Sequence, residues 1–522
     1  MGCPARFSIV VPVYNAKPEW LHGVVSSVQA QWYPNWELIL ADDASPSVQT
    51  RAFLEKLNDE RIIVRRLEQN SGIAGATNAA IEIAAGDYVV FLDHDDELTP
   101  DCLFELAKRI RYDNPDYLYS DEDKLDARGR YVEPFFKPDW SPDTLMSTMY
   151  TCHVSCVRKS LLEKVGLLRE EFNGAQDWDL VLRITEQTQR IAHIPKVLYH
   201  WRIVAQSTSG DLSAKPYAVE AGRRARESAL ERRFLTGTFA PLDGIFGFFS
   251  LQYSFPADTT ISVIVDRSKA RQDLAACIQS VARNSPGMRL EFIVVESSAE
   301  PDGVGSDAAA SGQPYKTINV KKADTPAARL NAGAVAATGD LLLFLSADLQ
   351  LQSDGGLARM GGYALLPHVA AVGGKILTPR LGRILHAGLL DGPKGPRRAF
   401  LLQDRLYRGH FLRNLLEFNW SSVSGDALMI RRETFQSLGR FHTSYVHDLA
   451  DVDLCRLALD AGLFNIVCPS VEFADKGWRD VFRETAADED LRLLRHRIPS
   501  CSGEDPYYNP NLRDDGSFQQ KR

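Results

Sequence analysis

The sequence NAAIEIAAGDYVVFLDHDDEL, residues 78–98, returns as NAGAVAATGDLLLFLSADLQL, residues 331–351, at an offset of 331 − 78 = 253. Each copy runs from an alanine-rich stretch through Gly-Asp into an apolar run that ends in polar residues. Three further pairs match in the same order: FSIVVPVYN with ISVIVDRSK, WELILADDAS with LEFIVVESSA, and AQDWDL with ADVDLC. Four ordered matches at so long a period predict two copies of one domain rather than a solenoid.

Short apolar runs alternate with helical patterns inside the first copy. The patterns predict strands at Ser8–Val13, Leu38–Ala41 and Tyr88–Leu92, and helices over Leu21–Gln29 and Ile73–Ala85. Strands that alternate with helices indicate an α/β fold with a mostly parallel sheet covered on both faces. Ligands bind beyond the carboxyl ends of such strands, so the polar residues that follow each strand are the functional candidates.

The repeat divides the 522 residues into four segments. They are a first domain over 1–210, a linker over 211–257, a second domain over 258–480 and a tail over 481–522. The linker carries a basic helical stretch and the apolar piece GIFGFFSLQYSF at 244–255. We expect that piece to be a buried strand, with interfacial membrane contact as the alternative. The charged tail is expected to be surface-hugging or disordered.

Composition excludes several classes of protein. Hydrophobic residues make up 44% and charged residues 25%, as in ordinary globular chains. The net charge of −8 argues against nucleic acid as a partner, because such proteins carry a basic excess. Eight cysteines without a CxxC pair predict neither a disulfide framework nor a zinc site, and they indicate a reducing cytosol. We expect no cleavable leader and no transmembrane helix, and hence a cytoplasmic protein.

The run FLDHDDEL places Asp93, Asp95 and Asp96 at the end of a predicted strand. Three carboxylates in four positions raise one another's pKa unless a cation lies among them. A hard divalent ion such as Mg²⁺, held together with substrate phosphates, would relieve that repulsion. The alternative is a solvated loop or a helix N-cap, where Asp is common. The strand-end position favours the metal site.

Other polar groups have two interpretations each. In ADDAS, Asp43 is either part of an ordinary turn or an acceptor for a nucleobase or ribose. In QDWDL, Asp177 is either a helix-terminus acid or a general base. In LYHWR, His200 and Arg202 are either structural or a metal ligand and a phosphate-binding guanidinium. The glycines of NSGIAGATN, residues 70–78, fit neither the Walker pattern nor GxGxxG, which disfavours ATPases and dinucleotide enzymes.

Together, PVYN, ADDAS, DHDD, QDWDL and LYHWR resemble, in order and spacing, the motifs of family-2 inverting glycosyltransferases. SDEDK at 120–124 and FKPDWSPD at 136–143 are similar to a rhamnosyltransferase-like subgroup of bacterial surface-polysaccharide and O-antigen enzymes. The resemblance covers residues 7–210 strongly and 258–478 more weakly. It implies two tandem GT-A-like domains, each Rossmann-like with a mostly parallel sheet.

The resemblance also implies a role for each matching residue. Asp177 would be the catalytic base, and Asp95 and His200 would hold Mg²⁺ or Mn²⁺. The nucleotide would lie against Pro12, Tyr14, Asn15, Asp43, Asp93 and Arg202. The expected donor is a UDP- or dTDP-sugar, and the expected acceptor is a growing bacterial surface glycan, lipid-linked in the leading interpretation. Peripheral association with the cytoplasmic face of the inner membrane remains an open alternative.

Elementary chemistry agrees with transfer rather than hydrolysis. The departing diphosphate needs charge neutralisation, which a metal supplies, and the acceptor hydroxyl needs a base. A single in-line displacement inverts the anomeric centre. A glycosidase would instead use a protonated acid and a second carboxylate without a metal.

The second copy lacks several of these groups. Asp93-His94-Asp95-Asp96 becomes Ser346-Ala347-Asp348-Leu349, His200 becomes Ala474, and Asp42-Asp43 becomes Glu296-Ser297. We therefore expect a degenerate second domain. The first alternative is a two-site polymerase whose second site uses Asp348, His386 and Asp451. The others are a non-catalytic glycan-binding scaffold and a nucleotidyltransferase, although no basic triphosphate loop is evident.

Overall fold

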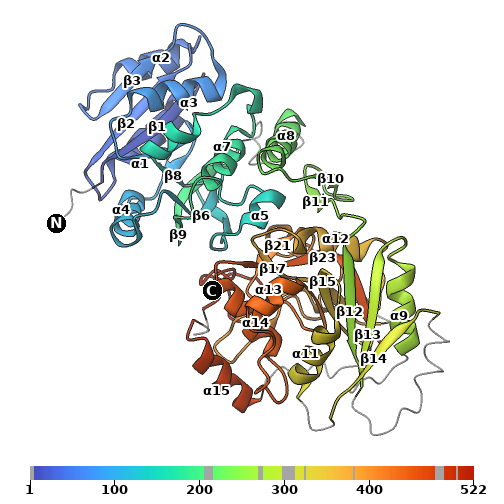
Figure 1. Cartoon of the computed structure of the whole chain (residues 1–522). Coiled ribbons are helices and arrows are strands. Elements are labelled where there is room, and N and C mark those ends of the chain that lie inside the picture. The colour runs from blue at the N-terminus through green and yellow to red at the C-terminus, as the bar shows by residue number, and fades with distance from the viewer. Residues whose placement is uncertain are drawn as a thin grey trace. The chain divides into compact units, whose positions relative to one another are not determined.

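The computed structural model describes residues 5–204, 216–267, 274–296, 312–321, 325–379, 382–476, 487–500 and 504–521. The chain forms two compact units, shown in Figure 1. Unit 1 comprises Met1–Trp140 and Thr148–Phe249, and unit 2 comprises Ser141–Ser147 and Ser250–Arg522. Each unit is described by itself.

Unit 1 is built on one mixed sheet whose strands run in the order β3-β2-β1-β4-β8-β6-β9-β5, with β7 beside β6. Strands β1 to β4 are mutually parallel, β8 is antiparallel to both of its neighbours, and β6 is parallel to β9. The strands are β1 Phe7–Val13, β2 Trp36–Asp42, β3 Ile62–Arg66, β4 Tyr88–Phe91, β5 Glu97–Leu98, β6 Tyr117–Leu125, β7 Tyr131–Phe135, β8 Ser155–Arg158 and β9 Ile191–Arg202.

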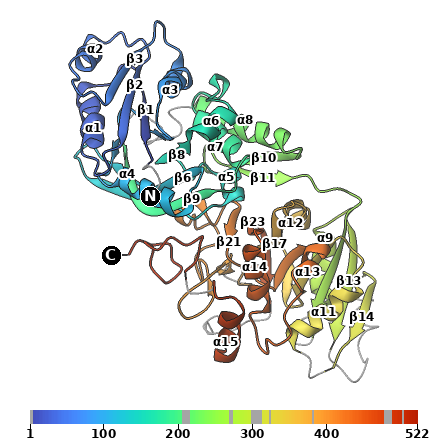
Figure 2. The same cartoon turned by 60° about the vertical axis from the view of Figure 1, so that its left-hand side comes forward.

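Helices cover both faces of this sheet, because its central strands are apolar on both sides. Figure 2 shows α1 and α3 on opposite sides of strands β1 to β3. Helix α1 begins with a proline, which suits a first helical turn, and buries Leu21, Val24, Val25 and Val28 on one face. The helices are α1 Pro18–Gln29, α2 Val48–Glu55, α3 Gly72–Ile83, α4 Cys102–Asp113, α6 Lys159–Val165, η1 Glu170–Phe172, α7 Gln176–Thr185 and α8 Pro216–Arg232.

Unit 2 repeats the same strand order, β14-β13-β12-β15-β22-β17-β23-β16, with β18 beside β17 and β21 beside β23. Parallel and antiparallel pairings also match those of unit 1, strand for strand. The predicted tandem α/β architecture is therefore confirmed. The strands are β12 Thr260–Asp266, β13 Arg289–Glu296, β14 Tyr315–Asn319, β15 Leu341–Ser346, β16 Leu349–Leu351, β17 Val369–Leu377, β18 Ile384–His386, β21 Phe418–Trp420, β22 Ala427–Arg431 and β23 Phe464–Asp475.

The smaller elements complete the molecule. A two-stranded sheet joins β10 and β11, and another joins β19 and β20. Helix α5, from the first half of the chain, belongs to unit 2, where Asn419 donates to Asp143 at 2.9 Å. The remaining elements are α5 Pro142–Ser147, β10 Gly237–Pro241, β11 Phe249–Tyr253, α9 Leu274–Arg283, α11 Pro326–Ala336, α12 Gly356–Ala364, β19 Leu389–Leu390, β20 Arg397–Arg398, η3 His410–Leu412, α13 Arg432–Ser437, α14 Ala450–Asp460 and α15 Asp488–Arg497.

Two segments differ from the expected boundaries. Helix α8, placed in the predicted linker, packs on α7, and its Arg226 is buried over the ring of Trp178 at 4.5 Å. It is therefore part of unit 1, and residues 205–215 lie outside the described residues. In the predicted tail, α15 buries Leu491, Leu494 and Ile498 in a cluster with α14, so this piece is folded. Residues 477–486 and 501–503 also lie outside the described residues.

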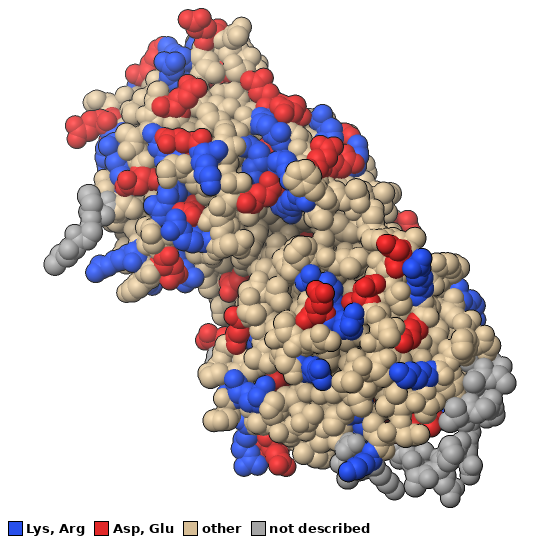
Figure 3. All heavy atoms as spheres, in the orientation of Figure 1, with Lys and Arg blue, Asp and Glu red and all other residues tan. Residues whose placement is uncertain are grey.

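On the face shown in Figure 3, basic and acidic side chains are interspersed without a continuous basic area. None of the helices that the structure describes combines the length and the apolarity that a membrane span requires.

Candidate active site

A pocket opens in unit 1 beyond the carboxyl ends of β1 and β4, the place that the strand pattern predicts for ligands. Its empty volume is about 630 Å³, counted out to the open mouth. Polar side chains from distant parts of the sequence meet in its wall, namely Asp93, His153, Gln176 and Asp177. Pro12 also lines the pocket, as predicted for the nucleotide site, beside apolar residues of β1, α3 and α7.

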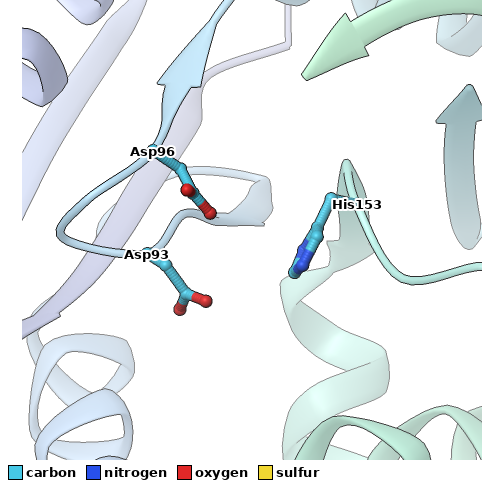
Figure 4. Close-up of side chains that lie close together, drawn as sticks. All are labelled: Asp93, Asp96 and His153. Carbon is cyan, nitrogen blue, oxygen red and sulfur yellow. The ribbon is translucent and has the colours of Figure 1, made fainter. Parts of the chain in front are cut away.

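Asp93, Asp96 and His153 form a group with metal-binding spacing, since one potential ligand atom from each lies within 4.8 Å of the others (Figure 4). Within the described part of the chain, no other group of three such side chains meets this spacing. The Tyr199 hydroxyl donates to Asp96 at 2.6 Å, and the His153 ring stacks on the Tyr199 ring at 4.4 Å. Tyr199 of strand β9 therefore holds the side chains of Asp96 and His153 in place.

Carboxylates are crowded at this point. Burial raises the pKa of Asp96 well above its ordinary value, and the charges of Asp95 and Asp93 raise it further. Burial and the Asp93 charge also raise the pKa of Asp95. Such crowding of carboxylates favours a bound cation, because a cation relieves the repulsion among them. The two carboxylates suit Mg²⁺ or Mn²⁺, whereas the imidazole is a softer ligand that favours a transition metal such as Mn²⁺.

Asp177 stands at the start of α7, with its side chain partly buried in the pocket wall. Burial raises the pKa of Asp177, the neighbouring Asp93 raises it further, and His153 opposes that change. A carboxylate with a raised pKa at a pocket wall has the properties of a general base.

The predicted nucleotide residues lie in loops at the same edge of the sheet. Asp43 is buried and accepts from the Ser71 N–H at 2.6 Å, which ties the end of β2 to the start of α3. Asn15 has a φ of 50° and accepts from the Ser47 N–H at 3.1 Å, whereas Tyr14 is 45% exposed. Apart from Pro12 and Asp93, the residues predicted for the nucleotide lie outside the set that lines the pocket.

His200 and Arg202 lie on β9 in different surroundings from those predicted. His200 hydrogen-bonds Asp123 at 2.5 Å through Nδ1, and its ring stacks on Tyr131 at 3.9 Å. The Arg202 side chain donates to the Asp95 carbonyl at 2.6 Å. Side chains alternate across a strand, so His200 faces away from Tyr199, which contacts His153. Neither Asp95 nor His200 belongs to the three-ligand group.

His153 was not among the predicted residues. It lies between α5 and β8, and no motif or strand-end position marks it. The sequence did mark another feature near the site. SDEDK has three consecutive acids within an otherwise strand-like stretch, and acids that are buried in a strand need hydrogen-bond partners. In β6 each acid has one: Asp121 with His193 at 3.0 Å, Glu122 with Lys137 at 2.9 Å, and Asp123 with His200 at 2.5 Å.

Unit 2 lacks this arrangement at the corresponding positions. The shared strand register places Ser346, Leu349 and Asp426 where unit 1 has Asp93, Asp96 and His153. Asp451, the counterpart of Asp177, accepts from the Gly425 N–H at 2.6 Å and the Val452 N–H at 2.9 Å.

The other two second-copy candidates are also within the folded unit. Asp348 and His386 are both buried, and His386 lies on β18 beside Ile376.

The sequence profile of glycosyl transferase family 2 matches the chain twice, over residues 8–166 and 262–439. These matches fall on the two sheets and together cover more than half of the chain. The chain therefore belongs to glycosyl transferase family 2.

Several curated proteins are similar to this chain. It is 35% identical to the uncharacterized protein y4gI of Sinorhizobium fredii over 97% of this chain and 57% of that protein. It is 32% identical to the O-antigen biosynthesis protein RfbC of Myxococcus xanthus, over 97% of this chain and 40% of that protein. The chain thus spans about half the length of these relatives.

A shorter relative has a more specific name. The Escherichia coli protein WfgD, a UDP-Glc:alpha-D-GlcNAc-diphosphoundecaprenol beta-1,3-glucosyltransferase, is 34% identical over 130 residues. That similarity covers 24% of this chain and 51% of WfgD.

Proposed function

We propose that unit 1 is the catalytic unit of an inverting, metal-dependent glycosyltransferase. It would move a sugar from a nucleoside-diphosphate donor to a growing bacterial surface glycan of the O-antigen or capsule type. The observation that carries this proposal is the pocket wall in which Asp93, His153 and Asp177 meet beyond the ends of β1 and β4. These residues come from three separate segments, and all three line the same pocket.

Asp177 would accept the proton of the acceptor hydroxyl as that oxygen attacks the anomeric carbon. The raised pKa of Asp177 brings its proton affinity closer to that needed for general-base work near neutral pH. The bond to the diphosphate breaks on the opposite side of the sugar, so one displacement inverts the anomeric centre. Apolar side chains of α3 and α7 limit the access of water to the pocket.

Asp93, Asp96 and His153 would hold the divalent cation, Mg²⁺ or Mn²⁺. When bound, the cation would neutralise charge that develops on the departing diphosphate. The earlier prediction of Asp95 as a ligand is retained as a competing proposal, since Asp95 lies in the same loop. His200 is better supported as the partner of Asp123.

The donor and acceptor are proposed from the relatives. The name of WfgD specifies a UDP-sugar and a diphosphoundecaprenol-linked acceptor, which favours a UDP-sugar donor and a lipid-linked acceptor for this chain. A dTDP-sugar remains the competing donor. The reaction would then take place on the cytoplasmic side of the inner membrane, with the protein associated peripherally.

The first test is a thermal-shift panel of UDP, dTDP, GDP and CMP, each with and without Mn²⁺. A ligand that binds the folded state raises the melting temperature by mass action. We expect one nucleotide to stabilise the wild type only with Mn²⁺. The shift should disappear in Asp93→Ala and His153→Ala, whereas loss in Asp95→Ala alone would favour the competing ligand. A cooperatively melting protein that responds to no nucleotide would contradict transferase function and favour a glycan-binding scaffold.

A further inference from the structure

Lys137 is a buried cation that lies close to the candidate active site without lining its pocket. It follows β7, its side chain is 0% exposed, and it is not among the residues that line the pocket. Its ammonium donates to Glu122 at 2.9 Å, to the Thr151 carbonyl at 2.8 Å and to the His153 carbonyl. An ammonium has three protons to donate, so these bonds use all of them.

Glu122 completes the contact from the other side. Its carboxylate accepts from the His153 N–H at 3.0 Å, in addition to the bond from Lys137. The next residue, Val154, donates its N–H to the Ser120 hydroxyl at 3.3 Å. The ion pair thus binds both backbone groups of His153 and connects them to β6. The imidazole points from this anchored backbone toward Asp93 and Asp96, as Figure 4 shows.

The sheet of unit 2 forms without an acid at the position that corresponds to Glu122. In unit 1, Glu122 pairs with Tyr199, and in unit 2 the corresponding pair is Ile376 with Phe473. The same strand order forms there with an apolar residue in place of the acid. Buried ion pairs generally stabilise a fold no better than apolar residues of similar size, so stability alone does not account for this one.

We propose that the Lys137–Glu122 pair is a positioning device that holds the His153 imidazole against Asp93 and Asp96. The proposal deepens the proposed function, since it assigns the residues that orient one side of the cation site. Lys137 and Glu122 are positioning residues and touch neither donor nor acceptor. Groups that orient metal-binding side chains in this way typically change metal affinity by about 10- to 100-fold when they are replaced.

The test replaces both partners at once, in Lys137→Met/Glu122→Leu. A single substitution would leave one buried charge uncompensated and could unfold the protein, whereas the double variant removes both charges and places an apolar residue where unit 2 has Ile376. We expect cooperative unfolding to be retained and the Kd for Mn²⁺, measured by electron paramagnetic resonance, to rise at least about tenfold. In a His153→Ala background the same double substitution should change that Kd less than twofold.

A matched control comes from unit 2. Arg359, which is 15% exposed, and the buried Glu417 form another ion pair at 3.1 Å, and Arg359→Leu/Glu417→Leu should leave the Mn²⁺ affinity within twofold of wild type. A tenfold loss in this control as well would overturn the proposal, because it would mark a general response to the loss of buried charge.

A second readout does not depend on the metal. Nuclear magnetic resonance spectra can be recorded on protein labelled at the histidine Cε1. In the double variant the His153 signal should shift or broaden, while the other histidine signals stay in place. A folded double variant with an unmoved His153 signal and unchanged Mn²⁺ affinity would overturn the proposal. If the wild type binds no Mn²⁺, the metal part of the proposed function fails, and the His153 signal alone then decides the positioning role.

Discussion

Asp177 and Asp179 lie two positions apart on α7 in opposite surroundings. Asp179 is fully buried and accepts from Arg169 and Arg183, each at 3.0 Å, so its charge is compensated within the protein. Asp177 faces the pocket beside Asp93 and His153, and its pKa is raised mainly by burial. One turn of helix thus carries a structural acid and a candidate base.

Asp177→Asn should lower the turnover number for sugar transfer by about 100-fold or more, because a general base contributes that much to such a step. Nucleotide affinity, measured by calorimetry, should stay within threefold of wild type. The wild-type rate should fall as pH falls, at a higher pH than an ordinary carboxylate would give, since protonated Asp177 cannot accept the acceptor's proton.

Asp179→Asn is the matched control for that substitution. It leaves two arginines without their carboxylate, so it should lower the melting temperature. An Asp177→Asn protein with wild-type turnover would remove Asp177 from the mechanism.

Asp451 makes the stability of unit 2 depend on pH. Burial raises its pKa from 3.8 to about 6, and the nearby Asp426 and Asp448 contribute. Between these values the folded state binds more protons than the unfolded state, so the free energy of unfolding falls as pH rises. The loss is on the order of 3 kcal/mol and is complete above the folded pKa.

Asp451→Asn cannot titrate, so its unfolding transition should vary less between pH 4 and 6 than that of the wild type. Thermal unfolding at a series of pH values measures this difference. Equal pH dependence in both proteins would show that other groups are responsible.

At the scale of the elements, apolar runs predicted the positions of strands and helices well, whereas charged runs did not. Strand β1 and helix α3 lie within a few residues of their predicted ranges because burial on both faces leaves a clear apolar pattern. In contrast, three consecutive acids interrupt the apolar pattern of β6. They are buried because their partners, among them Lys137 and His193, lie many residues away and are brought close only by folding.

The residues of the candidate site also differ in how clearly the sequence marks them. Asp93 and Asp177 could be predicted because each stands at the end or start of a patterned element. His153 could not, since its position depends on the buried contacts of an irregular segment.

Gly174 permits the close approach of α8 to the loop that precedes α7. Its φ is +97°, and an added Cβ would lie 2.7 Å from the Tyr217 ring and 3.0 Å from the Ala218 backbone. Gly174→Ala should therefore destabilise the protein by about 1–3 kcal/mol and lower turnover, because α7 carries Asp177.

The control for this substitution is Gly129→Ala. Gly129 has a φ of +73° but no atom within 4 Å of an added Cβ, so it isolates the backbone strain from the clash. Equal losses of melting temperature in both variants would show that the contact of Gly174 with α8 adds nothing to the effect of backbone strain.

At the scale of the whole molecule, two sheets of the same strand order carry different side chains at the ends of their corresponding strands. We expect Asp348→Asn and Asp451→Asn to leave transfer within twofold of wild type, whereas Asp177→Asn should slow it about 100-fold or more. Product analysis of each variant with the natural acceptor measures this. Loss of one linkage in Asp451→Asn and of another in Asp177→Asn would instead support the two-site polymerase.

The position of helix α5 in the sequence also matters for folding during translation. Its residues Asp143 to Ser147 are buried, yet Asn419, which donates to Asp143, lies 276 residues later in the sequence. At about 5–20 residues per second, roughly 14 to 55 seconds of translation separate the two on the ribosome. During that interval Leu145 and Met146 have no completed unit 2 to cover them, so a nascent chain arrested before Asn419 should be a preferred client of chaperones.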